Sequence, residues 1–169
     1  MIRSIQRWFV RLALSGVGLC LLMGTSAAPV AARLQQVDAP ATLIAIRAAS
    51  HPEETPRYDR VVFEFHGRLP ENIRVEYVPR LIADGSGAVI PVRGNAILKL
   101  TVFPASAHSE NGNATVPGRI SYNLPVVTEI VRSCDFEAVV SYGIGLSHKT
   151  EFRFSTLTDP TRIVLDFFP

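Results

Sequence analysis

The stretch Arg60-Val61-Val62-Phe63-Glu64-Phe65 decides the fold class of this 169-residue chain. Apolar side chains at Val61, Phe63 and Phe65 alternate in it with polar ones. Such alternation, with a period of two, is typical of a β-strand that has one face in a core and the other in water. We therefore predict a half-buried strand here, introduced by Tyr58-Asp59 and ended by Gly67.

The end of the chain repeats this pattern as Arg162-Ile163-Val164-Leu165-Asp166-Phe167. Arginine, two β-branched residues, a large apolar residue, an acid and phenylalanine recur in the same order. We interpret the repeat as two core strands of one domain rather than as a duplicated site. In each strand the arginine and the acid lie four residues apart on one face, which predicts a surface charge ladder worth at most about 1 kcal/mol.

Other apolar runs of four to eight residues are separated by turn-forming clusters. They are predicted as strands over residues 42–48, 73–78, 89–93, 96–103, 126–132, 136–142, 151–155 and 162–168, with a short extended piece at 120–123. Outside the N-terminal segment, no window of ten residues shows a helical period without a breaker. Many short strands joined by turns predict an all-β sandwich or barrel.

Several turns are also predicted. Gly94-Asn95 between two strand-like runs indicates a tight hairpin, and Pro91, which has no amide hydrogen, is expected on an edge strand. Residues 104–118 are polar and turn-forming and are expected to be a long exposed loop. Gly143-Ile144-Gly145-Leu146 has no helix after it to form a phosphate-binding loop, so we interpret it as a bulge or bend.

The first 32 residues have the layout of a secretory signal peptide. A basic start carrying Arg3, Arg7 and Arg11 precedes an apolar run over residues 12–23 and a small-residue stretch. The apolar run is shorter than the roughly 20 residues that span a bilayer. Cleavage after Ala32 fits best; lipidation at Cys20 and an uncleaved anchor are the alternatives. We expect a signal peptide at 1–32, a flexible leader at 33–41 and one domain at 42–168.

Composition limits the partners of the remaining chain. It holds 14 of the 17 basic residues against all 15 acidic ones, a balance of about −1. Because there is no basic excess to neutralise phosphates, we expect no nucleic-acid partner. Membrane contact is expected only through the signal segment, and the protein is expected to be exported, to the periplasm or the extracellular space.

No motif in the sequence indicates catalysis, a cofactor or a metal. Ser86 lacks the context of a nucleophile elbow, and Cys134 is expected to be a small, partly buried strand residue with no partner base. The four histidines have no close metal-ligand spacing, and we expect them at the surface: His51, His66, His108 and His148. We expect a protein that is not an enzyme, with no catalytic residues, no cofactor and no metal site.

The ordered set of strand and turn motifs resembles the AMIN-like domain family of exported bacterial proteins. The matching motifs begin with Tyr58-Asp59-Arg60-Val61-Val62-Phe63-Glu64-Phe65 and end with Leu157-Thr158-Asp159-Pro160-Thr161-Arg162-Ile163-Val164-Leu165-Asp166. Between them lie Arg74-Val75-Glu76-Tyr77-Val78, Asp84-Gly85-Ser86-Gly87, Asp135-Phe136-Glu137 and Gly143-Ile144-Gly145-Leu146. After Glu137 the family has glycine, where this chain has Ala138. The resemblance implies a β-sandwich related to AMIN domains, which are modules for envelope targeting thought to bind peptidoglycan.

Binding is therefore the expected use of the polar surface. Arginine suits the carboxylates of peptidoglycan stem peptides, and tyrosine rings suit sugar faces. The predicted ligand-binding residues are Arg57, Tyr58, Arg74, Tyr77, Tyr142 and Arg153. The expected function is an exported, non-catalytic module that recognises peptidoglycan or another envelope polysaccharide. The alternative is a structural or protein-interaction module that docks an envelope protein through an exposed sheet edge near Pro91.

Overall fold

The computed structural model describes residues 40–169, and over this part of the chain it contains strands and no helix. The predicted signal peptide and leader up to residue 39 lie outside the described residues. Among residues 40–169 there is no helix long and apolar enough to cross a membrane.

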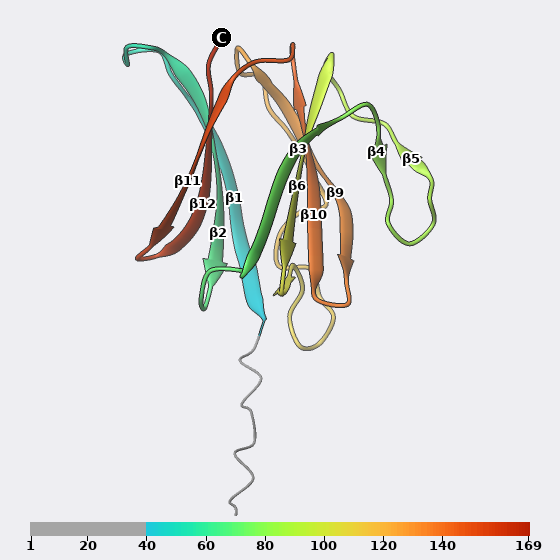
Figure 1. The fold of residues 1–169 in the computed structure, drawn as a ribbon. Coiled ribbons are helices and arrows are strands. Elements are labelled where there is room, and N and C mark those ends of the chain that lie inside the picture. Colours follow the sequence, from blue (N-terminus) through green and yellow to red (C-terminus); the bar gives the residue numbers. More distant parts are fainter. Residues whose placement is uncertain (1–39) are drawn as a thin grey trace, which may run out of the picture. The chain divides into compact units, whose positions relative to one another are not determined.

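Two five-stranded sheets face each other as a sandwich (Figure 1). The first sheet has the strand order β11 (Phe152–Thr158), β12 (Thr161–Phe167), β2 (Tyr58–His66), β1 (Ala41–His51) and β7 (Ala105–Ser106). The second has the order β3 (Asn72–Val78), β6 (Ala96–Phe103), β10 (Val139–Leu146), β9 (Val127–Phe136) and β8 (Arg119–Ser121). The short strands β4 (Leu81–Ile82) and β5 (Val89–Ile90) pair only with each other. The all-β, mostly antiparallel fold confirms the predicted class.

The core lies between the two sheets and uses the alternation seen in the sequence. Val61, Phe63 and Phe65 of β2 are buried, as are alternate residues of β12. They face buried side chains of the second sheet: Leu98, Leu100, Val102, Val140, Tyr142, Ile144 and Leu146. Each large buried side chain contributes about 1.5–3 kcal/mol, so the two repeated motifs supply much of the driving force for folding.

The two repeated motifs are antiparallel neighbours. Val62 pairs with Val164 at the centre, and on either side of this pair the arginine of one strand lies opposite the acid of the other. Arg60 is thus opposite Asp166, and Arg162 is opposite Glu64. A repeat that the sequence shows along the chain becomes, in the sheet, an approximately two-fold arrangement of charges on one outer face.

Residues 79–95, which hold β4 and β5, cover the part of the outer face of the second sheet that β9 and β10 form. Leu81 is fully buried against β10, where a Cβ on Gly143 would lie 2.7 Å from the Leu81 side chain. A Cβ on Gly145 would collide with the Arg93 carbonyl oxygen. The motif that contains both glycines lies inside β10, so the predicted bend between strands is wrong. The pairing of β10 with β9 does shift register, at Ser141/Tyr142 and at Gly145/Leu146, but the additional residues, Ser133 and Thr128, lie on β9. The two glycines of the motif instead make room for the cover.

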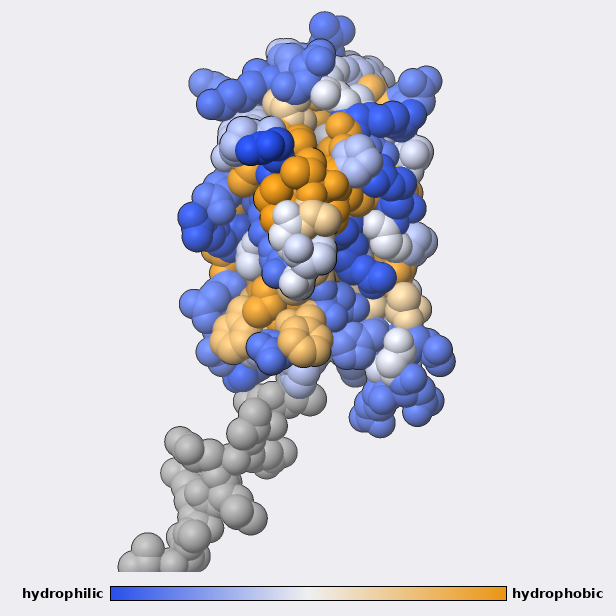
Figure 2. All heavy atoms as spheres, turned by 90° about the vertical axis from the view of Figure 1, so that its right-hand side faces the viewer, coloured by the Kyte–Doolittle hydropathy of each residue, from blue (hydrophilic) through white to orange (hydrophobic). Residues whose placement is uncertain are grey.

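Figure 2 shows this covered side of the molecule, with apolar side chains gathered on it. Val89 on β5 is 53% exposed. Phe103 and Phe136, at the ends of β6 and β9, are also exposed, and Val139 pairs directly with Phe136.

The predicted hairpin at Gly94-Asn95 is wrong. Strand β5 pairs with β4, and β6 pairs with β3 and β10, so the two runs flanking Gly94 never meet. Gly94 has a positive φ of 112° and packs against the Leu146 carbonyl, where a side chain would collide. Pro91 lies after β5 in the covering segment, and its carbonyl accepts a hydrogen bond from Arg119. It therefore marks no edge of the sandwich.

Two further boundaries differ from prediction. The predicted loop 104–118 is not wholly exposed, because Ala105, Ala107 and Val116 are buried. Asp135 holds this segment by accepting from the Ala107 backbone at 2.8 Å, which the sequence pattern does not reveal. The predicted strand 136–142 contains the β9–β10 turn, in which Glu137 and Ala138 both have positive φ.

Candidate functional site

The broad face of the first sheet that points away from the core carries the candidate site. Its side chains form rows across the strands, because each strand contributes every second residue. The first row holds His51 and Tyr58, and the second holds Ala49, Arg60, Asp166 and Arg153. The third row has two valines at its centre and polar residues at its ends: Arg47, Val62, Val164 and Ser155. The fourth is Ala45, Glu64, Arg162 and Leu157.

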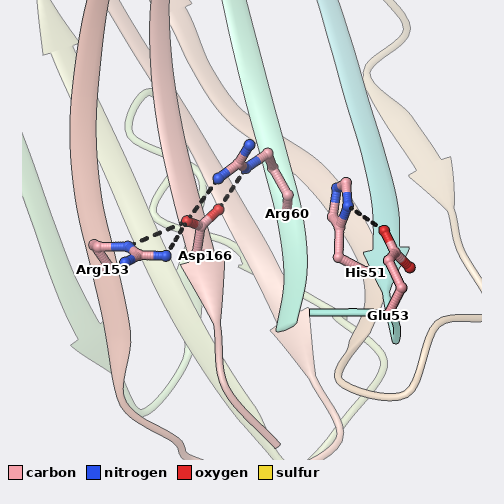
Figure 3. A network of polar contacts seen from close by, with 5 residues as sticks. All are labelled: His51, Glu53, Arg60, Arg153 and Asp166. Carbon is pink, nitrogen blue, oxygen red and sulfur yellow. Dashed lines mark hydrogen bonds and ion pairs between the residues drawn. The ribbon is translucent and has the colours of Figure 1, made fainter. Parts of the chain in front are cut away.

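Asp166 is the centre of the second row (Figure 3). Arg60 on β2 donates two hydrogen bonds to its carboxylate, at 2.6 and 2.9 Å. Arg153 on β11 donates two more, at 3.3 and 3.1 Å. The Asp166 side chain is only 2% exposed, whereas those of Arg60 and Arg153 are 36% and 59% exposed. One buried carboxylate thus orients two exposed guanidinium groups.

The charges in this row shift each other's titration. Burial acts to raise the pKa of Asp166, but hydrogen bonds and charges from Arg60 and Arg153 outweigh it and hold that pKa below its ordinary value. The hydrogen bond to Asp166 raises the pKa of Arg60. Asp166 is therefore ionised at neutral pH, and the row holds one carboxylate between two arginines.

Aromatic rings lie beside the arginines. Tyr58 stacks on His51 with ring centroids 4.8 Å apart and meets Phe168 edge-on at 6.2 Å. The Arg60 guanidinium lies 5.0 Å from the Tyr58 ring centre, and that of Arg153 lies 5.5 Å from the ring centre of Phe168. We call these five residues, His51, Tyr58, Arg60, Arg153 and Phe168, the arginine–aromatic surface.

The other carboxylate of the charge ladder is used differently. Glu64 is bonded to Arg47 of β1, while Arg162, which lies opposite Glu64, donates to the carbonyls of Pro160 and Asp159. No arginine of β11 reaches this row, because Leu157 stands opposite Arg162. Although the two motifs are alike in sequence, Asp166 is the carboxylate on this face that two arginines contact, whereas Glu64 contacts Arg47.

A groove of about 520 Å³ opens beside the surface, along β1. We call it the β1 groove, and its lining residues are Ile46, Arg47, Ala48, Ala49, His51, Arg60, Val62 and Tyr122. A smaller cavity of about 150 Å³ lies at the end of the sheet, between Arg57, Tyr58 and Pro125. The lining of the larger groove is cationic and apolar.

The six predicted ligand-binding residues do not form one site. Tyr58 and Arg153 meet through Phe168, and Arg57 precedes Tyr58 in the chain and lines the smaller cavity with it. Arg74 lies on β3 in the other sheet and pairs with Glu76 at 2.7 Å.

The two remaining tyrosines face the interior. Tyr77 is half-buried, and its hydroxyl donates to the Thr150 carbonyl at 2.6 Å, so it holds structure. The prediction for Tyr142 is wrong: it is 1% exposed in the core, 5.8 Å from the Phe63 ring, and burial raises its pKa to about 12. Tyr142 lies two positions before Ile144 on β10, so both side chains point to the core.

Sequence reasoning missed the partners that organise the site. His51 was expected only as a surface histidine, and Phe168 lies beyond the repeated motif. Arg60 and Asp166 were interpreted as charges of a ladder within each strand; their pairing across strands follows only once the two motifs are antiparallel neighbours. The matching order of arginine and acid in the two motifs was the signal available for it.

The two buried aspartates, Asp59 and Asp166, do not point toward a common site. Asp59 points into the sandwich and accepts from the backbone of Val126 and Val127 at 2.7 and 2.9 Å, while Asp166 points outward. Among residues 40–169 no group of three or more histidine, cysteine, aspartate or glutamate side chains is placed to hold a metal ion. Cys134 is free and half-buried on β9, and burial raises its pKa.

A two-sheet sandwich with an uncovered face of oriented arginines defines the class of the protein, a β-sandwich module with a surface suited to anionic groups. The family model of the AMIN-like domain matches residues 41–168, and the chain therefore belongs to that family. It is accordingly an envelope-associated domain, of a kind that generally binds or localises rather than catalyses and is typically found in exported envelope proteins. Neither the curated proteins nor the solved structures gave a match in the same comparisons.

Proposed function

We propose that this domain is exported and binds peptidoglycan, through contacts between stem-peptide carboxylates and the arginine–aromatic surface. The observation that carries the proposal is the orientation of Arg60 and Arg153 by the buried Asp166. A guanidinium has five N–H donors in a fixed plane, and two of them go to Asp166 in each arginine, so the others remain for a ligand. Holding the two groups in place before binding reduces the entropy lost on binding.

The rings of this surface support carboxylate recognition better than sugar stacking. Tyr58 already has His51 on its ring and Arg60 close to it. The single tryptophan of the sequence, Trp8, falls in the predicted signal peptide. The aromatic side chains therefore serve chiefly to fix the arginines and to lower the local dielectric around them.

Retention on purified sacculi tests the proposal. Protein obtained by expression of the full-length chain is expected to sediment with sacculi at low ionic strength and to be released at high salt, because screening weakens exposed charge contacts. Arg153→Ala is expected to reduce retention about tenfold. Arg74→Ala is the matched control, since Arg74 is an exposed, carboxylate-paired arginine on the other sheet.

The result that would reject the proposal is equal retention of the two variants, or no retention of the parent protein at low salt. Sacculi amidated at their free carboxylates provide a second arm. They should lose the protein if carboxylates are the ligand, whereas unchanged retention would point to the glycan.

A further inference from the structure

Strand β1 has a free edge over most of its length. Its pairing with β2 runs from Thr42 to His51, but on its other side β7 pairs only with Ala41 and Thr42. Within the described part of the chain, no other strand continues that pairing. The bulge at Ile44 separates the covered beginning of β1 from this open edge.

The backbone groups on the open edge are identified by one contact. Ala48 and Tyr122 line the groove together. Burial raises the pKa of Tyr122 and the Ala48 backbone opposes this rise, as an N–H that faces the phenolic oxygen does, so the Ala48 N–H points toward Tyr122 and away from β2. Along a strand, the backbone N–H and C=O groups of successive residues point alternately to its two sides. Those of Ile46 and Ser50 therefore point to the same side as those of Ala48. These three residues present the donors and acceptors that an added strand requires.

The core is also incompletely covered along this edge. Val61 and Phe63, which point inward from β2, are 0% and 1% exposed, whereas their neighbours on β1, Ala48 and Ile46, are only half-buried. The β1 groove of about 520 Å³ runs past these two side chains. A strand laid along β1 would therefore bury apolar surface as well as pair backbone groups.

The open run lacks the usual protection of an edge. Residues 45–51 read Ala-Ile-Arg-Ala-Ala-Ser-His, with no proline, no lysine and one arginine. Natural edge strands are normally blocked by such residues or by an inward-pointing charge. Tyr122 lines the groove beside Ala48 and packs partly buried against the core, so an added strand has to displace its side chain, a peptide carbonyl then replacing the phenolic oxygen as the partner of the Ala48 N–H.

The charged residues that line the β1 groove indicate which kind of strand would add to β1. Arg47, His51 and Arg60 line the groove, and no carboxylate is among its lining residues. Each of the three already contacts one carboxylate outside the groove, Glu64, Glu53 and Asp166 respectively, so a ligand carboxylate would use their remaining N–H donors. Self-pairing of two copies through antiparallel β1 strands centred on Ala48 would bring the two Arg47 side chains close together, which like charges disfavour. We propose that β1 takes an extended acidic segment of a partner protein as an added strand, with its backbone on Ile46, Ala48 and Ser50 and a carboxylate on Arg47.

This inference goes beyond peptidoglycan binding and is tested separately. The probe is a blocked, fluorescent eight-residue peptide that alternates valine with glutamate; its control alternates valine with lysine. Anisotropy titrations with protein from the full-length sequence should show saturable binding of the acidic peptide and at least tenfold weaker binding of the basic one. Amide hydrogen exchange at Ile46, Ala48 and Ser50 should slow when the acidic peptide is bound.

Three variants make the test specific. Ala48→Pro removes one edge donor without touching the ladder to β2 and should weaken binding at least tenfold. Arg47→Glu should reverse the preference toward the basic peptide, while Arg74→Glu, its match on the other sheet, should change nothing. Arg153→Ala should bind the acidic peptide normally even where it fails on sacculi.

The proposal is overturned by equal binding of both peptides, by unchanged binding to Ala48→Pro, or by binding with no exchange protection on β1. Concentration-dependent dimers of the free protein that Ala48→Pro abolishes would assign the edge to a second copy instead. If Ala48→Pro fails to fold, the exchange pattern of the parent protein and the reversal by Arg47→Glu decide the question.

Discussion

Asp166 and Glu129 are both buried carboxylates that contact two arginines, on opposite sides of the sandwich, but the two clusters have different consequences. Each is 2% exposed at its side chain and is held by two arginines, Arg60 and Arg153 for Asp166, Arg93 and Arg119 for Glu129. The arginines of Asp166 come from neighbouring strands, so nothing is fixed above them. Arg93 belongs to the covering segment, and both its backbone N–H and its guanidinium contact Glu129.

The difference shows why one face is bare and the other covered. Glu129 binds a segment onto the second sheet, and Arg119 adds a hydrogen bond to the Pro91 carbonyl at 2.9 Å. Thr128 accepts from Arg93 and also donates to its carbonyl. On the first sheet no described segment lies over Asp166, so its arginines point to solvent. The same ion-pair chemistry closes one face and leaves the other available.

Filling the space under the cover is expected to have the largest effect. Gly145→Val should abolish folding or cost more than about 4 kcal/mol, because a side chain there collides with the Arg93 backbone and lies 2.9 Å from Thr128 Oγ1. Ala49→Val, on the bare face, should change the free energy of unfolding by less than about 0.5 kcal/mol. Soluble yield and urea denaturation measure both, and a folded Gly145→Val protein would show that residues 79–95 do not need this close contact.

Removing the two carboxylates should separate their roles. Glu129→Ala is expected to cost about 3–4 kcal/mol, because it leaves a backbone N–H and two arginines without their acceptor and loosens the cover. Asp166→Ala is expected to cost about 2 kcal/mol, since its two arginines are exposed and regain water. Urea denaturation compares the two, and an equal or larger loss for Asp166→Ala would contradict the distinction.

Ionisation of Asp166 should make the free energy of unfolding depend on pH in the acidic range. Its folded pKa is lowered, so its stabilising effect is fully present above the unfolded carboxylate pKa of about 3.9 and is lost as pH falls through the folded pKa. The stability difference between the parent protein and Asp166→Asn should be constant at about 1–2 kcal/mol from pH 5 to 7 and shrink below about pH 4. Denaturation at a series of pH values checks this, and a difference that grew in acid would reverse the assigned sign.

Two turns give the smallest expected effects, with opposite signs. Ala138 in the β9–β10 turn of the second sheet has a φ of 61°, so Ala138→Gly should stabilise the protein by about 0.5–1 kcal/mol. Gly67 ends β2 of the first sheet with a φ of 90° and open space around it, so Gly67→Ala should destabilise by about 1 kcal/mol through backbone strain alone. Thermal melts measure both, and a loss in Ala138→Gly would show that the alanine methyl contributes packing.

Much of the fold follows from local patterns. The alternation in residues 60–65 and 162–167 gave the correct inward faces, and Ile73, Val75 and Tyr77 of the predicted strand 73–78 pack against the core as every second residue. Ala138 adopts a positive φ, a conformation that glycine takes without strain, which is the physical reason for expecting glycine after Glu137. The failed hairpin at Gly94 shows the limit of the method, because a glycine needed for tertiary packing has the same local signature as one needed for a turn.

The candidate site was only partly accessible to sequence reasoning. Tyr58 and Arg153 were identified by residue type, and Tyr142 was wrongly included because its hydroxyl says nothing about which face it occupies. Glu129 gave no signal, since its partners Arg93 and Arg119 lie 36 and 10 positions before it, beyond the reach of a local pattern.

The sequence by itself determined the strands, their buried faces and the sandwich class, because a period of two and the turn residues act within a few positions of each other. Only the tertiary structure decided which strands became neighbours. That pairing brought Arg60 and Arg153 onto one carboxylate, folded residues 79–95 over one face, and left β1 with an open edge. These features depend on contacts between residues up to 106 positions apart, which no local pattern encodes.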